Sequence, residues 1–456
     1  MKVVRFIFEN HHLKNFIKPH KIFLATGMFF GILFLLLTPP FQVPDEPSHF
    51  FRAWQVGHGI YFNKTLEAFI PENIVDLASK YLYKIRNKGE KLTLSEIEND
   101  LFYGESVNSN RLTIISSNAS PYTPVQYIFS GMGLFFAEKF NLSALCAFYF
   151  GRFLNLAVWL GVITLGIYRL PALGWEAVFL TLLPMSIFQG MSLSADSFNN
   201  AVCFFLFFTI FRIYFNSNFN FYDFILATFL AAVAGFNKQI VILPFFLLAF
   251  TYNKFPSPRL FILYFVVSVV LIISASAWPL LNNFPGIPDS VLKEKMNNAF
   301  QHWYNPFFIL AETTIVKLPG IARSFIGKLG WLDCILPLWT YILYFFGFFL
   351  ILTILCRTDF KNLFHIRLTA VFILLLYYCV IVFTFYFLLD TEHQLVAAGI
   401  QGRYFLPISA IIYFIFSKYK FINSKFYSKL LSYNIYIYIY IYNYTNRINN
   451  FCINNI

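Results

Sequence analysis

The feature that most constrains this chain is a series of long apolar runs spread over most of its length. A helix needs about 20 largely apolar residues to cross the hydrocarbon core of a bilayer, and shorter runs leave the helix boundaries approximate. The pattern predicts an all-α polytopic membrane protein with about ten transmembrane helices. The runs lie at 22–38, 144–168, 175–193, 198–215, 221–236, 239–252, 260–281, 335–355, 366–389 and 404–417.

Composition agrees with a membrane protein that has the lipid bilayer as its main partner. The chain is 58% hydrophobic and only 12% charged, whereas a soluble domain is about a quarter charged. The net charge of +12 comes from Lys and Arg at the ends of apolar runs, so no nucleic-acid partner is expected. The six cysteines form no CxxC pair, which gives no sign of a disulfide framework or a zinc site.

The distribution of basic residues predicts the topology. The basic segment 1–21 precedes the first run, which ends in Pro39-Pro40 rather than in small residues, so we expect an uncleaved first span with a cytoplasmic N-terminus. The run 122–137 is either an interfacial or re-entrant helix or a true span. The first reading places these basic residues in cytoplasmic connections, as the positive-inside rule requires: Arg169, Arg212, Lys254, Arg259, Arg357, Lys361, Arg367, Lys418, Lys420 and Lys425.

This topology divides the chain into a basic N-terminus, a membrane domain at 22–425 and a tail at 426–456. Three extracytoplasmic segments stand out, namely the long first loop 39–143, the loop 282–334 and the short segment 390–403. Loops of such length are usually functional when they are ordered. The tail contains the repeat IYIYIYIY and is expected to be low-complexity sequence, of aberrant or truncated origin.

The first candidate site follows the first span, in the stretch PPFQVPDEPSHFFR at 39–52. Prolines stiffen the backbone around Asp45 and Glu46, and His49 and Arg52 follow within about a helical turn. Such a cluster is suited to a general base, or to a metal or phosphate site in which Asp45 and Glu46 would hold a divalent metal. The alternative is a polar loop whose charges face water.

Three further residues could contribute to a site on the same face. Asp196 is either a second carboxylate over the same cavity or a helix N-cap. Lys238 and Arg403 both lie at the outer face, against the positive-inside bias. Each is a candidate for binding an anionic group, although Lys238 could simply extend to the interface. Arg403 could instead pair with Asp390 or Glu392.

Two more motifs close the outer segments. Trp331 and Asp333 lie in KLGWLD, and Gln401 and Tyr404 flank Arg403 in QGRYFLP. An acid and an aromatic residue beside the membrane indicate substrate contact, although a tryptophan alone is an ordinary interface residue. Walker, dinucleotide, serine-hydrolase and zinc-protease motifs do not occur, which leaves those enzyme classes without support.

Several of these motifs, in this order, resemble the bacterial membrane-protein family known as domain of unknown function 2142. They span residues 38–407 and comprise PPFQVPDEPSHFFRA, SPYTPVQY, GRFLNL, LPMSIFQGMSLSADSFNNA, FNKQ, KLGWLD and QGRYFLP. That family is similar to the C-type glycosyltransferase fold (GT-C), whose catalytic acid lies just after the first span. The resemblance therefore implies a bacterial cytoplasmic-membrane enzyme that is active at its extracytoplasmic face.

The resemblance also implies roles for individual residues. Asp45 would deprotonate the acceptor hydroxyl, Glu46 would support it or bind a metal, and Asp196 would be a second outer carboxylate. Arg403 and Lys238 would hold the phosphate of a polyprenyl-phosphate-linked sugar donor.

Two hypotheses follow from the sequence. The first is a glycosyltransferase that moves a sugar from the polyprenyl carrier to a cell-envelope glycan, lipid or protein. The second is a non-catalytic membrane component, or a transporter or flippase, of surface-polysaccharide assembly. A transporter would place polar groups near the middle of the membrane on broken helices, whereas the charges here collect at the rim.

Overall fold

The computed structural model describes most of the hydrophobic part of the chain. The described residues are 18–63, 65–87, 92–107, 110–170, 172–216, 219–237, 239–278, 289–351, 363–389 and 396–416. Lys238, Asp390, Glu392, the basic segment before Lys18 and the tail at 426–456 lie outside this set, so the structure says nothing about the expectations that fall on them.

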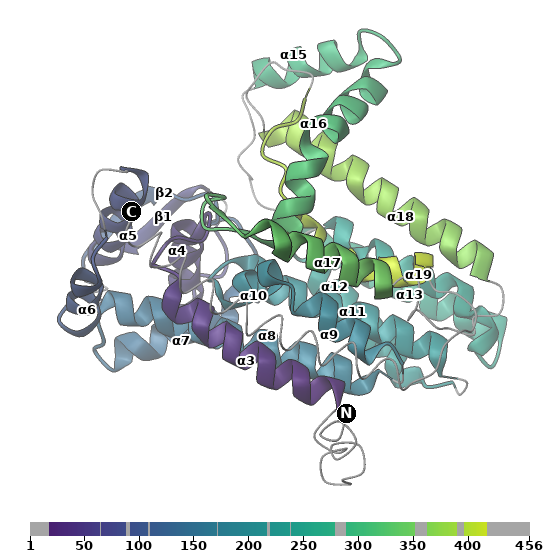
Figure 1. Ribbon diagram of the computed structural model, residues 1–456, viewed down its shortest axis with the longest axis horizontal. Helices are drawn as coiled ribbons and strands as arrows, with labels where there is room; N and C mark the ends of the chain where they lie inside the picture. Colours follow the sequence, from purple (N-terminus) through teal and green to yellow (C-terminus); the bar gives the residue numbers. More distant parts are fainter. Residues whose placement is uncertain are drawn as a thin grey trace.

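Five of the described helices are long and apolar enough to cross a membrane. The first four are α3 (Pro19–Leu37), α8 (Ala144–Arg169), α11 (Ala195–Phe215) and α13 (Pro258–Ser276). The fifth is α18 (Leu363–Thr384), which continues into the π-helical turn η4 (Phe385–Leu389). Helix α11 lies at the centre of the bundle with most of its residues buried, whereas α13 and α18 are largely exposed (Figure 1).

The other expected spans appear as shorter elements. They are α9 (Gly174–Thr181), α10 (Pro184–Met191), α12 (Phe221–Gly235), the 3₁₀ segment η2 (Gln239–Lys254) and α17 (Leu338–Leu350). The end of the described chain consists of η5 (Gly402–Phe405), η6 (Ser409–Ile411) and α19 (Ile412–Phe416). The described residues thus support a helical membrane protein but not the expected count of ten full-length spans.

The run 175–193 is one expected span that the structure shows as two short helices. It is not one helix, because it breaks at Leu182 and Leu183 into α9 and α10. Pro184 occupies the first position of α10. Proline cannot donate the hydrogen bond that would continue the preceding helix, and its ring clashes with that helix. Helices α9 and α10 lie beside α3 and α8, and the chain then continues into α11.

The long segment between α3 and α8 forms a small folded unit, which we call the 39–143 unit. Its helices are α4 (Glu46–Gly57), α5 (Glu72–Arg86), α6 (Leu94–Phe102), the 3₁₀ turn η1 (Pro124–Tyr127) and α7 (Ile128–Lys139). Strands β1 (Glu67–Pro71) and β2 (Leu112–Ser116) pair antiparallel, with Phe69 opposite Ile114. The unit has its own apolar core, in which Phe41 and Phe50 pack on Phe148 of α8.

Helices α4 and α7 approach each other at a pair of glycines. A Cβ atom on Gly57 would lie 2.4 Å from the backbone oxygen of Gly131, and one on Gly131 would lie 2.7 Å from that of Ala53. Only residues without a side chain allow this backbone contact. Because α4 begins directly after Asp45, the contact ties the position of that residue to α7 and, through α7, to α8.

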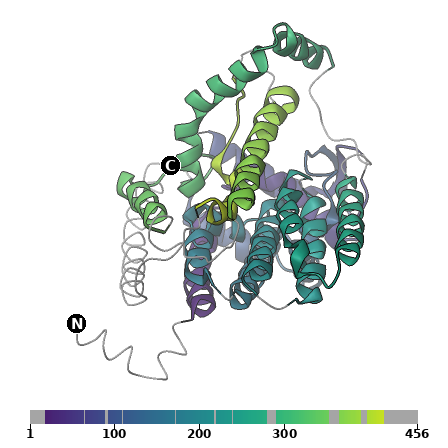
Figure 2. The same cartoon turned by 90° about the vertical axis from the view of Figure 1, so that its right-hand side faces the viewer.

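A second excursion follows α13. Helices α15 (Asp289–Phe300) and α16 (Asn305–Gly327) lead into the short strands β3 (Lys328–Leu329) and β4 (Cys334–Ile335), which pair as a hairpin. In both views α15, α16 and α18 project from the rest of the bundle (Figures 1 and 2). The β3–β4 hairpin contacts the chain that leaves α3 through Trp331 and Asp333.

The two ends of the bundle carry different polar groups. At the site end, which we define as the end where α3 stops and α8 and α11 begin, the chain forms the 39–143 unit. At the opposite end, Asp223 is 1% exposed and accepts hydrogen bonds from Arg169 at 2.5 Å and Arg212 at 2.9 Å. Lys254 donates to the carbonyl groups of Ile213 and Asn216 at the end of α11, both at 2.6 Å.

Candidate functional site

Asp45 is presented to solvent by an unusual backbone conformation. It is the residue before α4 and has φ 64° and ψ 2°, in the left-handed region that non-glycine residues rarely adopt. Its side chain makes no capping hydrogen bond to α4 and is 62% exposed. Strain of this kind concentrates at functional sites. Here it separates the carboxylate of Asp45 from that of the next residue.

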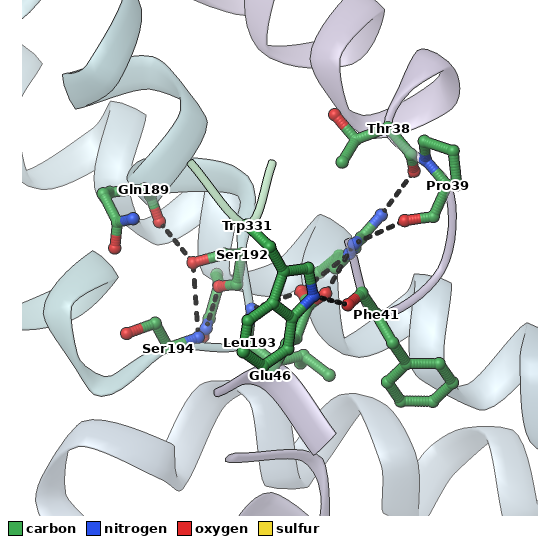
Figure 3. Close-up of polar contacts among 11 residues, drawn as sticks. Thr38, Pro39, Phe41, Glu46, Gln189, Ser192, Leu193, Ser194 and Trp331 are labelled. Atoms are coloured by element: carbon green, nitrogen blue, oxygen red, sulfur yellow. Dashed lines mark hydrogen bonds and ion pairs between the residues drawn. The ribbon is translucent and has the colours of Figure 1, made fainter. Parts of the chain in front are cut away.

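Glu46, by contrast, is fully buried in an ion pair with Arg152. Arg152 donates from Nε to Oε1 at 2.9 Å and from Nη2 to Oε2 at 2.6 Å, and both side chains are 0% exposed. The remaining donors of Arg152 bind the carbonyl groups of Thr38 and Pro39, at 2.9 and 3.2 Å. Figure 3 shows how these groups converge on the loop after α3. Glu46 therefore holds α3, α4 and α8 together.

The same carboxylate also reaches the start of α11. The amide of Leu193 donates to Oε1 of Glu46 at 3.2 Å, and Ser192 and Ser194 form the adjoining turn (Figure 3). Glu46 thus has partners on two sides and no exposed face. This arrangement leaves Glu46 no side that faces solvent, whereas Asp45 is exposed. Among the described residues, no group of three or more His, Cys, Asp or Glu side chains is placed to hold a metal ion.

Arg403 lies against Asp45. Its Nη2 atom donates to Oδ2 of Asp45 at 3.1 Å and to the hydroxyl of Tyr404 at 3.4 Å. The side chain is only 6% exposed, and within the described chain its Nε atom has no hydrogen-bond partner. Burial alone would lower the pKa of Arg403, but Tyr404, Asp196 and Asp45 raise it above its ordinary value. Arg403 is therefore a permanent, buried positive charge with an unused donor.

The backbone around Arg403 is held tightly. A Cβ atom on Gly402 would lie 2.1 Å from the backbone nitrogen of Phe325, so only glycine fits where η5 crosses α16. The amide of Gly402 donates to the hydroxyl of Ser324 at 2.8 Å. Tyr377 of α18 donates to the carbonyl of Tyr404 at 2.7 Å. Two helices therefore fix the position from which Arg403 extends.

Asp196 faces the same group of residues. It lies in the first turn of α11 and is 8% exposed, and the helix is capped by the Ser194 hydroxyl, which accepts from the Asp196 amide at 3.2 Å. Ser194 is thus the N-cap, and Asp196 is not. The charge of Asp196 acts on Arg403 and on Tyr122. The structure therefore brings both carboxylates, Asp45 and Asp196, to one arginine.

Two tyrosines complete the surroundings of the acids. Burial raises the pKa of Tyr122 above its ordinary value, and the charges of Asp196 and Asp45 raise it further. The Tyr127 hydroxyl lies 2.7 Å from Nδ1 of His49, which places His49 within the same cluster. Both tyrosines belong to SPYTPVQY, and neither is predicted from the sequence as a site residue. The signal available in the sequence was that Tyr122 and Tyr127 flank Pro124 in this motif.

Arg52 is surrounded by backbone carbonyl groups of the 39–143 unit. It is 0% exposed and donates to the carbonyl groups of Tyr122 at 2.9 Å, Ile60 at 3.0 Å and Tyr61 at 2.7 Å. Burial lowers the pKa of Arg52 to about 10. It holds the backbone of the 39–143 unit, including that of Tyr122, in place.

Three more of the expected site residues lie around this cluster, namely Trp331, Asp333 and Gln401. Trp331 donates from Nε1 to the carbonyl of Phe41 at 3.0 Å (Figure 3), and Asp333 accepts from Gln42 at 3.3 Å. Both residues therefore dock the β3–β4 hairpin on the loop that leads to Asp45. Gln401 precedes η5, and its buried Oε1 atom has no hydrogen-bond partner in the described chain.

The resulting arrangement has defined chemical abilities. An exposed carboxylate lies beside a buried guanidinium, with a second carboxylate and two tyrosines around them. A carboxylate can accept a proton from a bound hydroxyl group, and a guanidinium can bind phosphate oxygens and stabilise developing negative charge. The geometry therefore suits a reaction in which a hydroxyl attacks and a phosphate leaves.

Comparison with models of known protein families gives a match over most of the chain. A family model described as "Predicted membrane protein (DUF2142)" matches residues 28–412 of the 456. No curated protein and no solved structure matches the chain.

Proposed function

The chain belongs to the DUF2142 family of predicted membrane proteins, and from that premise we propose that it is a membrane glycosyltransferase. Its donor would be a sugar carried on a polyprenyl phosphate, and its acceptor a hydroxyl group of a cell-envelope glycan, lipid or protein. The position of Asp45 directly after the first span also supports a relationship to the C-type glycosyltransferase fold.

The contact between Asp45 and Arg403 carries this proposal. A carboxylate that is 62% exposed meets a guanidinium that is 6% exposed. The neighbouring pair of Glu46 and Arg152 differs, because both of its side chains are fully buried. The exposed side of Asp45 leaves room for a substrate hydroxyl. The Nε atom of Arg403 has no partner in the described chain but is sealed from solvent, so a phosphate oxygen reaches it only when neighbouring side chains move.

The chemistry can be written in one step. Asp45 takes the proton of the acceptor hydroxyl while the oxygen of that hydroxyl attacks the anomeric carbon of the donor sugar. The bond between that carbon and the phosphate oxygen breaks, and its electron pair leaves with the polyprenyl phosphate. Arg403 stabilises the added negative charge, because a preorganised donor in a water-poor site is effective there. The charge of Asp196 also favours the charged form of Arg403.

The charge pattern supports an extracytoplasmic active face. Asp45 and Arg403 lie at the site end of the bundle, whereas Arg169, Arg212 and Lys254 gather at the opposite end. Basic residues favour the cytoplasmic side of a membrane. We therefore orient the opposite end toward the cytoplasm of a bacterial cell and the site end away from it.

The proposal is tested with the purified full-length protein in liposomes. The protein is incubated with polyprenyl-phosphate sugars that carry a hexose, an N-acetylhexosamine or a pentose, together with an envelope extract as acceptor. Release of free polyprenyl phosphate from one of these donors, dependent on the acceptor, is the expected result. Absence of release from every donor, by a protein whose melting curve shows it to be folded, would count against the glycosyltransferase.

A further inference from the structure

Two adjacent amide side chains near the start of α11 have no hydrogen-bond partner among the described residues. Asn199 and Asn200 are each 1% exposed. Within the described part of the chain, neither the nitrogen nor the oxygen of either amide makes a hydrogen bond. Gln189 of α10 is also 1% exposed, and both of its amide atoms are likewise unpaired there.

The amides of Asn199 and Asn200 lie one helical turn from Asp196 on α11. Residues three and four positions apart are neighbours on a helix surface, so Asn199 and Asn200 both adjoin Asp196. The hydroxyl of Ser197 donates to the carbonyl of Gly190 at 2.7 Å and joins α11 to α10 beside Gln189. Two of the three amides therefore adjoin Asp196 on α11, and the third lies on α10 one residue from the carbonyl group that Ser197 binds.

Unpaired amides are unfavourable at this position. Helix α11 is a candidate membrane span, and polar side chains inside a span are costly unless they have partners. A buried donor or acceptor without a partner forfeits its hydration without compensation. Folding alone would be served better by leucine, which has a similar size, so the amides are explained more readily by a ligand than by packing.

The chemistry of the amides indicates the ligand class. Each amide offers two N–H donors and a carbonyl acceptor, and a sugar hydroxyl both donates and accepts. None of the three side chains is charged, so they match a neutral polyhydroxylated group better than an ion. The unpaired amide atoms are sealed from solvent, so entry of a ligand requires the neighbouring side chains to move.

We propose that Asn199, Asn200 and Gln189 form a subsite for the hydroxyl groups of the donor sugar. This inference rests on the proposed function, since it assigns the sugar to the interior side of Asp196 and the phosphate to Arg403. The subsite then distinguishes one sugar from another, whereas Arg403 binds the phosphate, which every polyprenyl-phosphate donor carries.

Binding measurements on the purified full-length protein test the subsite. Bare polyprenyl phosphate is compared with polyprenyl phosphate that carries a hexose, an N-acetylhexosamine or a pentose. We expect one sugar-bearing lipid to bind the unaltered protein at least tenfold more tightly than the bare lipid. N199L and N200L should lose this sugar-dependent gain in affinity, which we call the sugar increment, and retain affinity for the bare lipid. Their melting temperature should be unchanged or raised.

Asn155 provides the matched control, because its amide is buried on α8 but paired, donating to the carbonyl of Ser192 at 2.8 Å. N155L should lower the melting temperature without removing the sugar increment. Equal affinity of the unaltered protein for all four lipids overturns the subsite without the need of any variant. An increment that survives in N199L and N200L also overturns it. Failure to bind even the bare lipid would instead contradict the proposed function.

Discussion

Asp45 and Arg403 are 358 positions apart in the sequence, yet Nη2 of Arg403 donates to Oδ2 of Asp45 at 3.1 Å. The contact joins the loop after the first span to the last described turns before α19. Each residue is held by its own scaffold: Asp45 by the ion pair of its neighbour Glu46, and Arg403 by the fit of Gly402 against α16. The site therefore depends on the whole bundle being assembled.

The buried ion pair beneath Asp45 should be essential for stability. Replacing Arg152 with leucine leaves the carboxylate of Glu46 buried without its partner, and breaking a buried pair in this way costs about 3–5 kcal/mol. We expect R152L to lower the melting temperature strongly in detergent. The double variant E46L/R152L removes both charges and should recover much of the loss. A double variant no more stable than R152L would refute this account of the pair.

Arg403 should bind the phosphate of the lipid. A hydrogen bond to a charged group contributes about 1.5–3 kcal/mol, so R403A should bind bare polyprenyl phosphate roughly 10- to 100-fold more weakly. R403K should recover only part of the affinity, because lysine lacks the planar fork of arginine. R323A alters an exposed arginine on α16 and serves as the control. Equal losses in R323A and R403A would show a general charge effect.

Gly402 should be irreplaceable for a steric reason. In G402A the new methyl group would meet the backbone of Phe325 and Ile321 at 2.1 and 2.3 Å, and backbone cannot yield easily. We expect Arg403 to be displaced and binding of polyprenyl phosphate to fall together with the melting temperature. At Gly320, on the same helix α16, a Cβ atom would meet no neighbouring atom within 4 Å. G320A should therefore be neutral or slightly stabilising, and equal behaviour of the two variants would contradict this explanation.

The 39–143 unit should lose stability in acid through Glu96. Thr93 and Glu96 form a capping box on α6, and Glu96 also pairs with Lys84. The hydrogen bond from Lys84, followed by that from the Thr93 backbone, lowers the pKa of Glu96 from 4.5 to about 2. Because the folded value is the lower one, the stabilisation is complete above pH 4.5 and is lost as the pH falls toward 2.

Hydrogen exchange of α6 across this pH range measures the effect. In the unaltered protein, protection of the α6 amides should decrease between pH 4.5 and 2. E96Q keeps a hydrogen-bonding side chain but cannot ionise, so its protection should be lower at neutral pH and vary less over the same range. An unchanged pH profile in E96Q would show that another group is responsible.

Much of the site could be inferred from local sequence. Prolines around Asp45, at the end of an apolar run, indicated an exposed acid at a membrane surface, and the structure places it at the end of the first span with an exposed side chain. Arg403 was recognisable because a lone arginine at the outer end of a span is unfavourable unless it has a partner. Both inferences depend only on the residue and its immediate neighbours, and the functional roles of Asp45 and Arg403 stay predictions.

Other features depend on contacts that no local pattern contains. Asp45 and Glu46 are adjacent and chemically alike, and only the left-handed conformation of Asp45 sends one outward and the other inward. Arg152 lies inside an apolar run, where an arginine needs a partner, but that partner, Glu46, is 106 positions away in the sequence. The break before Pro184 was readable from proline chemistry, whereas the span count also depended on helices that proved short.

The most direct test compares D45N with D76N in the liposome assay. Asp76 is another exposed carboxylate of the 39–143 unit, on α5 and outside the Asp45 cluster. D45N preserves the size of the side chain and removes its ability to accept the proton. We predict that D45N reduces acceptor-dependent release of polyprenyl phosphate by roughly 100-fold or more, since general bases contribute about 10²–10⁴ in rate, while D76N keeps it. Release by D45N at the rate of the unaltered protein would contradict the role of Asp45 as the base.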